Sequence, residues 1–396
     1  MIHLLKQGYG KLYRRFNTLL AISMVVLFTA VLFHQRMLFI AVGILMAYSL
    51  IGFLFERFTG NSVFLDNEKR AVVLFPGEQE KFSIFLTNKT KLGRLDGHLT
   101  FTTDENIIVE NAISNDGNVK RNHTIYSPLP NRSKVELELS VQADRRGVSR
   151  ISDVTYRYSN PFSFEKIALR AIGVLQLEVI VYPEKKQVFG LNEIMTNRIG
   201  TSNSPFSLHQ DQLEQIGTRD YFHSDSMQHI HWKASAKKQQ LQTKLFEKKM
   251  DMSWTILVNL GTYSRLGNMY LHENMEDYLA AVAYLCEQAI RAEYAVALHI
   301  NLGTIGVPSL RLDHGTGKLH LKRIFEMLAR INHTYPLIPV SRMIRHVDRD
   351  ILKHRAIVFV GEMDDVTKQY VARWKRRGVK VYRLHELEDQ YRIIQE

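Results

Sequence analysis

Residues 219–247 concentrate the side chains of this chain that could do chemistry. His223, Asp225, His229 and His231 fall close together there. His229 and His231 are two positions apart, so on a strand both imidazoles would lie on the same side. Imidazole nitrogens and carboxylate oxygens are ligands that zinc prefers. One hypothesis is therefore a metal-dependent or hydrolytic site built on these four residues.

The same segment also fits a structural role. Ile230 and Trp232 alternate with the histidines and are expected to be buried together. Charge-assisted hydrogen bonds would then fix the segment as a latch against the following domain, through Arg219, Asp225, Lys233 and Glu247. We favour the latch, because no nucleophile with a matching base is recognisable. Ser235, for example, lacks a Gly-x-Ser-x-Gly turn. The sequence thus predicts a protein that is not an enzyme and needs no cofactor.

Composition and charge limit the classes of protein to consider. The 396 residues are 45% hydrophobic, which is enough for two or three domains with buried cores. The net charge of +12 predicts attraction to an anionic partner without choosing one. The single cysteine, Cys286, excludes an internal disulfide and favours a reducing compartment.

Two uncharged apolar runs, residues 16–33 and 37–55, are separated by three residues only. Each is long enough for a helix across a bilayer, which predicts a transmembrane hairpin in residues 1–60. Lys6, Lys11, Arg14 and Arg15 precede the first run, so we expect both termini in the cytoplasm, with the lipid bilayer as one partner.

The rest of the chain changes its pattern twice. Residues 61–184 alternate apolar and polar side chains between turn residues, which is typical of an antiparallel, immunoglobulin-like β-sandwich. Residues 185–250 are polar and are expected to form a linker that carries the segment described above. Residues 251–396 alternate apolar strands with amphipathic helices, which predicts a Rossmann-like α/β domain with a mostly parallel sheet.

Ligands of such sheets bind beyond the carboxyl ends of the strands. Residues 259–264 follow the first strand and offer neutral oxygens only, so a divalent cation there is an open question. No glycine-rich phosphate loop is present. A basic segment with Arg373, Lys375 and Arg376 could contact phosphates beside Trp374, but no nucleic-acid-binding motif accompanies it, and we expect no nucleic acid partner.

The chemistry-rich segment resembles the hallmark of the bacterial family known as domain of unknown function 58. That family carries Arg-x-Tyr-x-x-Gly-Asp, then Ile-His/Asp-Trp-Lys-x-Ser-Ala-Arg and a final Phe-Glu. The matching residues here are Arg219, Tyr221, Asp225, His231, Trp232, Lys233, Ser235, Lys237 and Glu247. Ser224 replaces the usual glycine and Lys237 the usual arginine. Arg146-Gly147, Asn160-Pro161-Phe162 and Val181-Tyr182-Pro183 resemble further signposts of the family.

The resemblance implies a von Willebrand factor A-like α/β domain and no enzymatic activity. It also implies a MoxR-type AAA+ ATPase as partner, often alongside a transglutaminase-like membrane protein. The adhesion motif Asp-x-Ser-x-Ser of A-domain relatives is replaced by residues 259–263, Asn-Leu-Gly-Thr-Tyr, so its metal ligands are not carried over. The sequence therefore predicts a membrane-anchored, non-enzymatic adaptor that docks an ATPase during envelope assembly.

Overall fold

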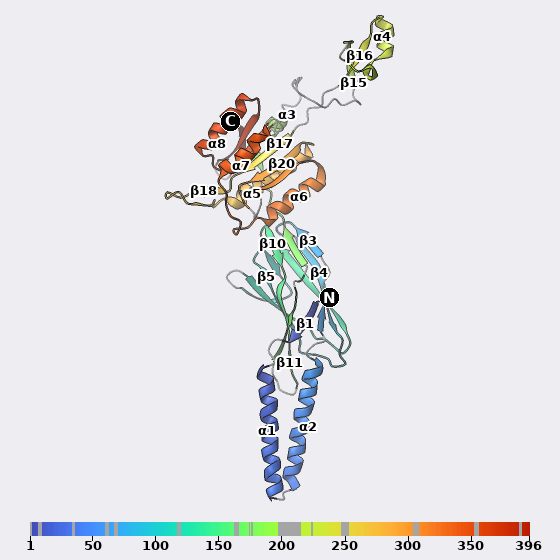
Figure 1. Ribbon diagram of the computed structural model, residues 1–396, viewed down its shortest axis with the longest axis vertical. Helices are drawn as coiled ribbons and strands as arrows, with labels where there is room; N and C mark the ends of the chain where they lie inside the picture. The colour runs from blue at the N-terminus through green and yellow to red at the C-terminus, as the bar shows by residue number, and fades with distance from the viewer. Residues whose placement is uncertain are drawn as a thin grey trace. The chain divides into compact units, whose positions relative to one another are not determined.

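The computed structural model divides the chain into two compact units, and each is described by itself (Figure 1). The first unit contains Met1–Glu184 and Glu326–Ile331, and the second contains Lys185–Phe325 and Asn332–Glu396. The structure describes residues 2–6, 10–33, 36–59, 63–66, 70–116, 120–161, 166–173, 175, 177–196, 215–222, 225–246, 253–303, 309–351, 356–387 and 390–396.

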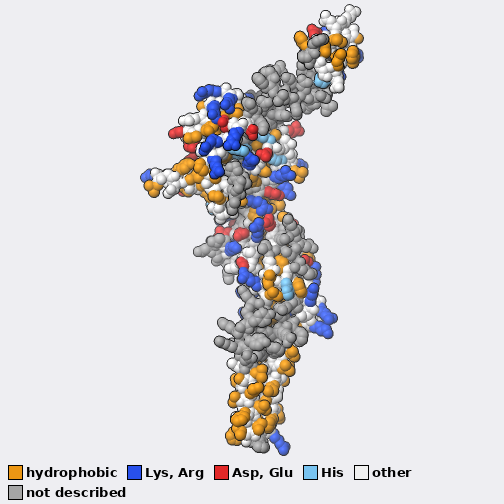
Figure 2. All heavy atoms as spheres, viewed as in Figure 1, with side chains coloured by type: hydrophobic (Ala, Val, Ile, Leu, Met, Phe, Trp, Pro, Cys, Tyr) orange, Lys and Arg blue, Asp and Glu red, His pale blue; other side chains and the backbone are white. Residues whose placement is uncertain are grey.

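Two paired helices occupy the positions of the two apolar runs. The helices are α1 (Gly10–Phe33) and α2 (Arg36–Thr59), and they pack against each other. Many of their large apolar side chains are exposed, among them Phe28, Phe33 and Met37 (Figure 2). The sequence pattern therefore located both helices.

The prediction that these helices cross a membrane is wrong. Within the ranges that the structure describes, no helix has both the length and the apolar character needed to span a bilayer. Both helices take in charged residues that the prediction placed outside the spans: Lys11, Arg14 and Arg15 in α1, and Arg36, Glu56 and Arg57 in α2. The predicted location in a bacterial cell membrane depends on those two spans, and it is therefore wrong as well. The same holds for the cytoplasmic termini and for lipid as a partner.

The first unit is a β-sandwich with one shared core. Its larger sheet has the strand order β6-β9-β4-β2-β1-β12-β11-β5-β8-β7 and is antiparallel throughout. The strands are β1 (Ile2–Lys6), β2 (Val63–Leu65), β4 (Gln79–Asn88), β5 (His98–Asp104), β6 (Ile107–Val109), β7 (Ile113–Asp116), β8 (Lys120–Tyr126), β9 (Lys134–Ala143), β11 (Ser152–Ser159) and β12 (Lys166–Ala171). Alternation along β9 and β11 sends every second side chain inward, as expected for a half-buried strand.

The smaller sheet closes the sandwich. It contains β10 (Gly147–Arg150), β13 (Leu177–Val181) and β3 (Arg70–Leu74), and β13 pairs with β3 in parallel. Leu74 and Val179 of this sheet share a core cluster with Phe82 and Leu99 of the larger one. Arg146 donates hydrogen bonds to the carbonyl oxygens of Leu328 and Ile331 within the same unit, each at 2.6 Å.

The second unit contains a seven-stranded mixed sheet in the order β14-β24-β23-β22-β17-β20-β21. The strands are β14 (Val188–Phe189), β17 (Ser253–Val258), β20 (Ala295–Ile300), β21 (Leu310–Gly315), β22 (Ala356–Val360), β23 (Lys380–Leu387) and β24 (Gln390–Gln395). The helices are α3 (Leu191–Thr196), α5 (Met275–Arg291), α7 (Val340–Arg349), α8 (Asp365–Arg376) and the first part of α6 (Gly317–Arg330), whose residues 326–330 belong to the first unit. A small hairpin of β18 (Gly261–Tyr263) and β19 (Met269–Leu271) follows β17.

The predicted fold class is also wrong for the α/β part. Only the four central strands β23, β22, β17 and β20 are mutually parallel, while β21 and β24 run antiparallel to their neighbours. Both antiparallel strands alternate exposed and more buried side chains, a pattern suited to strands that are covered on one face only. Counted over the described residues, the chain is mainly β, and a clear Rossmann-like von Willebrand factor A-like domain is not formed.

Candidate functional site

Most of the residues that carry the resemblance, here called the hallmark residues, lie in a small module of which residues 215–222 and 225–246 are described. β15 (Gln215–Asp220) and β16 (Gln242–Phe246) pair in antiparallel register, with Arg219 opposite Thr243. Between them lie the short 3-10 helix η1 (Met227–His229) and α4 (Trp232–Lys238). Ile230 pairs with Thr243 through an isolated bridge, which brings the start of α4 beside β16. The linker expected here is thus partly replaced by regular structure.

Asp225 ties one end of the module together. Its carboxylate accepts hydrogen bonds from Arg219 Nη2 at 2.7 Å, from the Phe222 backbone N–H at 3.1 Å and from Thr243 Oγ1 at 3.1 Å. The Arg219 guanidinium, and after it the Phe222 N–H, hold the pKa of Asp225 below its usual range. Both carboxylate oxygens of Asp225 therefore accept hydrogen bonds from the chain itself, and these bonds hold the module together.

His231 and Ser235 form the other end. His231 Nδ1 accepts a hydrogen bond from the Ala234 N–H at 3.0 Å and so caps α4. Buried Ser235 donates from Oγ to the His231 carbonyl at 3.0 Å and accepts from the Gln242 N–H at 2.8 Å. Gln242 in turn donates to Asp220 Oδ1 at 2.6 Å. These contacts assign packing roles to the His and Ser of the hallmark.

The structure does not assemble the predicted metal cluster. His231 Nδ1 is used as a helix cap and Asp225 is bound by Arg219. Among the described residues, no three His, Cys, Asp or Glu side chains are placed to hold a metal ion together. His223, a member of the proposed set, lies outside the described residues, as does Glu247 of the predicted latch.

Trp232 departs from the expectation that it would be buried with Ile230. Ile230 is only 2% exposed, whereas Trp232 is 68% exposed. Phe222, Met227 and Leu241 are also exposed, so several large apolar side chains lie on the surface of a small module (Figure 2). Lys233 and Lys237 are exposed beside Trp232 along α4, and Tyr221 donates weakly to the Asp225 carbonyl at 3.4 Å. The module therefore combines a polar, internally bonded interior with an apolar and basic surface.

Low pH should destabilise this module, because Asp225 loses its charge there. The lowered pKa of Asp225 means that its bonds stabilise the folded module above the ordinary aspartate pKa of about 3.9, and that this contribution disappears as the pH falls through the folded-state pKa. We expect the amide protons of β15 and β16 to lose protection against exchange below about pH 4. In Asp225→Asn the same amides should exchange faster at pH 7 and show no acid step of this origin. An unchanged acid step in the variant would contradict the role of Asp225.

The carboxyl edge of the sheet in the second unit is closed by two buried amides. Asn259 accepts at Oδ1 from Asn301 Nδ2 at 2.7 Å and from the Gly261 N–H at 3.0 Å, and it donates to the Glu362 carbonyl at 2.8 Å. Asn301 Oδ1 accepts from the Leu260 N–H at 2.7 Å. The side-chain oxygens of Asn259 and Asn301 are thus engaged with N–H donors. Gly361 has φ +101°, and any side chain there would meet the Asn259 carbonyl.

The basic helix α8 does not present Trp374 to a ligand. Trp374 is fully buried, and its indole N–H donates to Asp348 at 2.8 Å. Arg373 pairs with the same carboxylate. Burial raises the pKa of Asp348, but the bonds from Trp374 and Arg373 outweigh it and leave the pKa below its usual range. Cys286 is buried too, and burial raises its thiol pKa, which excludes a thiolate nucleophile at neutral pH.

Sequence reasoning missed three contributors: Gln242 and Thr243, which complete the hallmark network, and Asp348, which orients Trp374. Gln242 and Thr243 lie between the matching residues Lys237 and Glu247, and that proximity was an available signal. Asp348 carries no local signal, because its partners come from a separate helix 25 and 26 positions later.

Comparisons with known proteins give no family. No family model matches the chain, and no curated protein is similar to it. Among solved structures, CaCohA2 from Clostridium acetobutylicum is similar at 14% identity over 30% of this chain and 90% of that one, with a TM-score of 0.20. The major pilin subunit BcpA of Bacillus cereus is similar at 11% identity over 33% of this chain and 44% of that one, with a TM-score of 0.21. Likenesses this distant assign neither a fold nor a function.

Proposed function

We propose that this protein is a non-enzymatic adaptor that docks a protein partner through its hallmark module, residues 215–246. The observation that carries the proposal is the exposure of Trp232, which is 68%, together with exposed Phe222, Met227 and Leu241. Exposed tryptophan and other large apolar side chains are enriched where proteins bind one another. A module that orders itself through its own hydrogen bonds presents such side chains with little further loss of entropy.

The chemistry of the module supports binding over turnover. Asp225, His231 and Ser235 would be the reactive groups of an enzyme, yet each is engaged in a contact that shapes the module. A general base needs a free nitrogen or oxygen within reach of a substrate proton. Here the His231 Nδ1 lone pair and the Asp225 oxygens face N–H or O–H donors of the chain itself.

The resemblance to domain of unknown function 58 points to a MoxR-type AAA+ ATPase as the partner. Exposed Lys233 and Lys237 follow Trp232 on α4, so the complementary surface should combine an apolar pocket with carboxylates beside it. Ion pairs at the rim would govern the rate of association and its salt dependence, while Trp232 would govern the lifetime of the complex.

Trp232→Ala should weaken the complex with the ATPase of the same genome by about tenfold or more, because loss of a central tryptophan commonly costs over 2 kcal/mol of binding free energy. The measurement is biolayer interferometry of the purified full chain against that ATPase held in an ATP-bound state. Because Trp232 is exposed and the hydrogen bonds of the module do not involve its ring, the variant should keep its far-UV circular dichroism spectrum.

Leu95→Ala is the matched control, since Leu95 is 73% exposed and lies in the first unit. It should leave the affinity unchanged. Equal binding by the wild type and Trp232→Ala would refute docking through this module. Stoichiometric zinc in the purified chain that disappears in His229→Ala would instead support the alternative, a metal-dependent or hydrolytic enzyme.

A further inference from the structure

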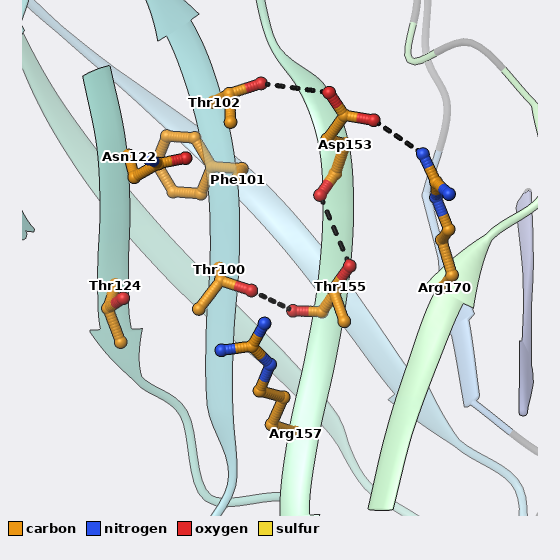
Figure 3. A pocket seen from close by; sticks show the side chains of 9 residues that line it. All are labelled: Thr100, Phe101, Thr102, Asn122, Thr124, Asp153, Thr155, Arg157 and Arg170. Atoms are coloured by element: carbon orange, nitrogen blue, oxygen red, sulfur yellow. Dashed lines mark hydrogen bonds and ion pairs between the residues drawn. The ribbon is translucent and has the colours of Figure 1, made fainter. Parts of the chain in front are cut away.

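A polar groove lies on the outer face of the larger sheet in the first unit. It has a volume of about 460 Å³, within the range of about 300–1,000 Å³ that is usual for small-molecule sites. Strands β8, β5, β11 and β12 form its floor (Figure 3). Its lining consists of Thr100, Phe101, Thr102, Asn122, Thr124, Asp153, Thr155, Arg157 and Arg170.

The register of the strands places these side chains in rows. Thr124 lies opposite Thr100, Thr100 opposite Thr155, and Thr155 opposite Arg170, so one row crosses four strands. Thr102 lies opposite Asn122 in the next row. Directly paired residues of neighbouring strands have their side chains close enough to contact one ligand together. The only aromatic residue of the lining, Phe101, is buried, so polar contacts must provide recognition.

Two threonine hydroxyls of the groove already use their protons in hydrogen bonds to backbone carbonyls of the same sheet. Thr100 Oγ1 donates to the Thr155 carbonyl at 3.0 Å, and Thr155 Oγ1 donates to the Asp153 carbonyl at 3.3 Å (Figure 3). A hydroxyl has one proton and two lone pairs, so each of these oxygens keeps acceptor capacity only. A ligand that complements them must bring O–H or N–H donors.

Arg157 differs from the threonines because it offers hydrogen-bond donors and a positive charge to a ligand. It is exposed, and its guanidinium has no hydrogen bond or ion pair with the residues that the structure describes. Figure 3 shows it extending beside Thr100 and Thr155. A planar guanidinium with five donors recognises carboxylate and phosphate oxygens in preference to neutral groups. A ligand that also carries an anionic group would therefore pair with Arg157.

A distortion of β11 shapes one wall of the groove. The register between β11 and β5 shifts between Ser152 and Thr155, and Asp153 within this bulge adopts φ +52°. Aspartate tolerates a positive φ better than most residues other than glycine, and a bulge of this kind redirects the side chains beside it. The bulge lets the Asp153 carboxylate accept from Arg170 Nη2 at 2.7 Å, which fixes Arg170 at the end of the threonine row.

We propose that this groove binds an acidic saccharide, whose hydroxyls donate to Thr100 and Thr155 and whose carboxylate or phosphate pairs with Arg157. Thr124 and Asn122 complete the site, since each side chain offers both a donor and an acceptor. The site is independent of the docking function proposed above, because it lies in the first unit and shares no residue with the hallmark module.

The test measures the binding of four probes to the full chain by ligand-detected saturation-transfer NMR. Probe concentrations of up to roughly 10 mM allow even weak binding to be detected. The probes are D-glucuronate, glucose 6-phosphate, D-glucose and inorganic phosphate. We expect one of the two acidic sugars to bind at least about tenfold more tightly than glucose and than phosphate, because only an acidic sugar satisfies both halves of the groove. The better of the two identifies the acid as carboxylate or phosphate.

Variants assign the affinity to the groove. Arg157→Gln should lower the affinity for the acidic sugar at least about tenfold and leave the weak binding of glucose unchanged. Thr124→Val should weaken both sugars alike. Arg145→Gln is the matched control, since Arg145 is exposed, lies outside the groove and should change nothing. Failure of both acidic sugars to bind, equal binding of glucose or phosphate, or an Arg157→Gln variant with wild-type affinity would each overturn the proposal.

Discussion

Replacing Trp374 with alanine should lower the free energy of unfolding of the second unit by about 3–5 kcal/mol. Trp374 is the largest fully buried side chain in the described part of the chain, and its ring packs in a cluster with Ile344, Phe359 and Val381. The substitution leaves a cavity between α7, α8 and the sheet, and Asp348 loses the indole N–H that it accepts at 2.8 Å. Urea unfolding, followed by hydrogen exchange of the β22 and β23 amides, measures the loss.

Two further variants separate packing from hydrogen bonding. Trp374→Phe keeps most of the ring volume and removes the donor, so we expect a loss of about 1–2 kcal/mol. Lys375→Ala, at the exposed neighbouring position, should stay within about 0.5 kcal/mol of the wild type. A loss under about 1 kcal/mol for Trp374→Ala would show that the indole is not part of this core and would restore the idea of a ligand-facing ring.

Asn301→Ala should destabilise the second unit by about 2–4 kcal/mol. Asn301 is completely buried, and its amide bonds the Leu260 N–H, Asn259 Oδ1 and, at 3.3 Å, the Ile338 carbonyl. Without it, the Leu260 N–H and the Ile338 carbonyl lose their bonds to this side chain in a site closed to water. Urea unfolding with the exchange of β17 and β20 amides is again the measurement.

The matched control is Asn268→Ala on the exposed β18–β19 hairpin, which should stay within about 0.5 kcal/mol of the wild type. The variant Asn301→Asp tests whether the carboxyl edge of the sheet in the second unit can bind a cation. A carboxylate there would oppose Asn259 Oδ1 and the Ile338 carbonyl, so the variant should be less stable with or without Mg²⁺. Recovery of its stability in Mg²⁺ would show that the edge still holds a cation, against the view that the two asparagines close it.

The two asparagines occupy the carboxyl ends of the parallel strands with hydrogen bonds of their own. In the mixed sheet, β17, β20 and β22 end side by side in parallel, and their carboxyl ends would be the usual place for a ligand. Asn259 and Asn301 join two of those ends directly, and Gly361 allows the third to approach the Asn259 carbonyl. An edge joined in this way contributes stability through its buried hydrogen bonds.

The sequence by itself determined many of the helices and strands and their order, but it missed the regular structure within residues 215–246 and the strands β21 and β24. Strict alternation in residues 134–143 gave β9, apolar runs such as residues 356–360 gave the central strands, and two long apolar runs gave α1 and α2. Periodicity is a local property, because it follows from how side chains project from a strand or helix. The types of residue in the hallmark also indicated a charged pair, and the structure shows one between Arg219 and Asp225.

Only the tertiary structure decided which of these side chains are covered. Trp232 and Trp374 both lie in helices beside lysines, yet one is exposed and the other fully buried, because α4 belongs to a small module while α8 packs against α7 and a sheet. Likewise the Asn259–Asn301 bond joins strands 42 positions apart, and the threonine rows need four strands in register. Burial and pairing of this kind depend on contacts between distant segments, and no local pattern records them.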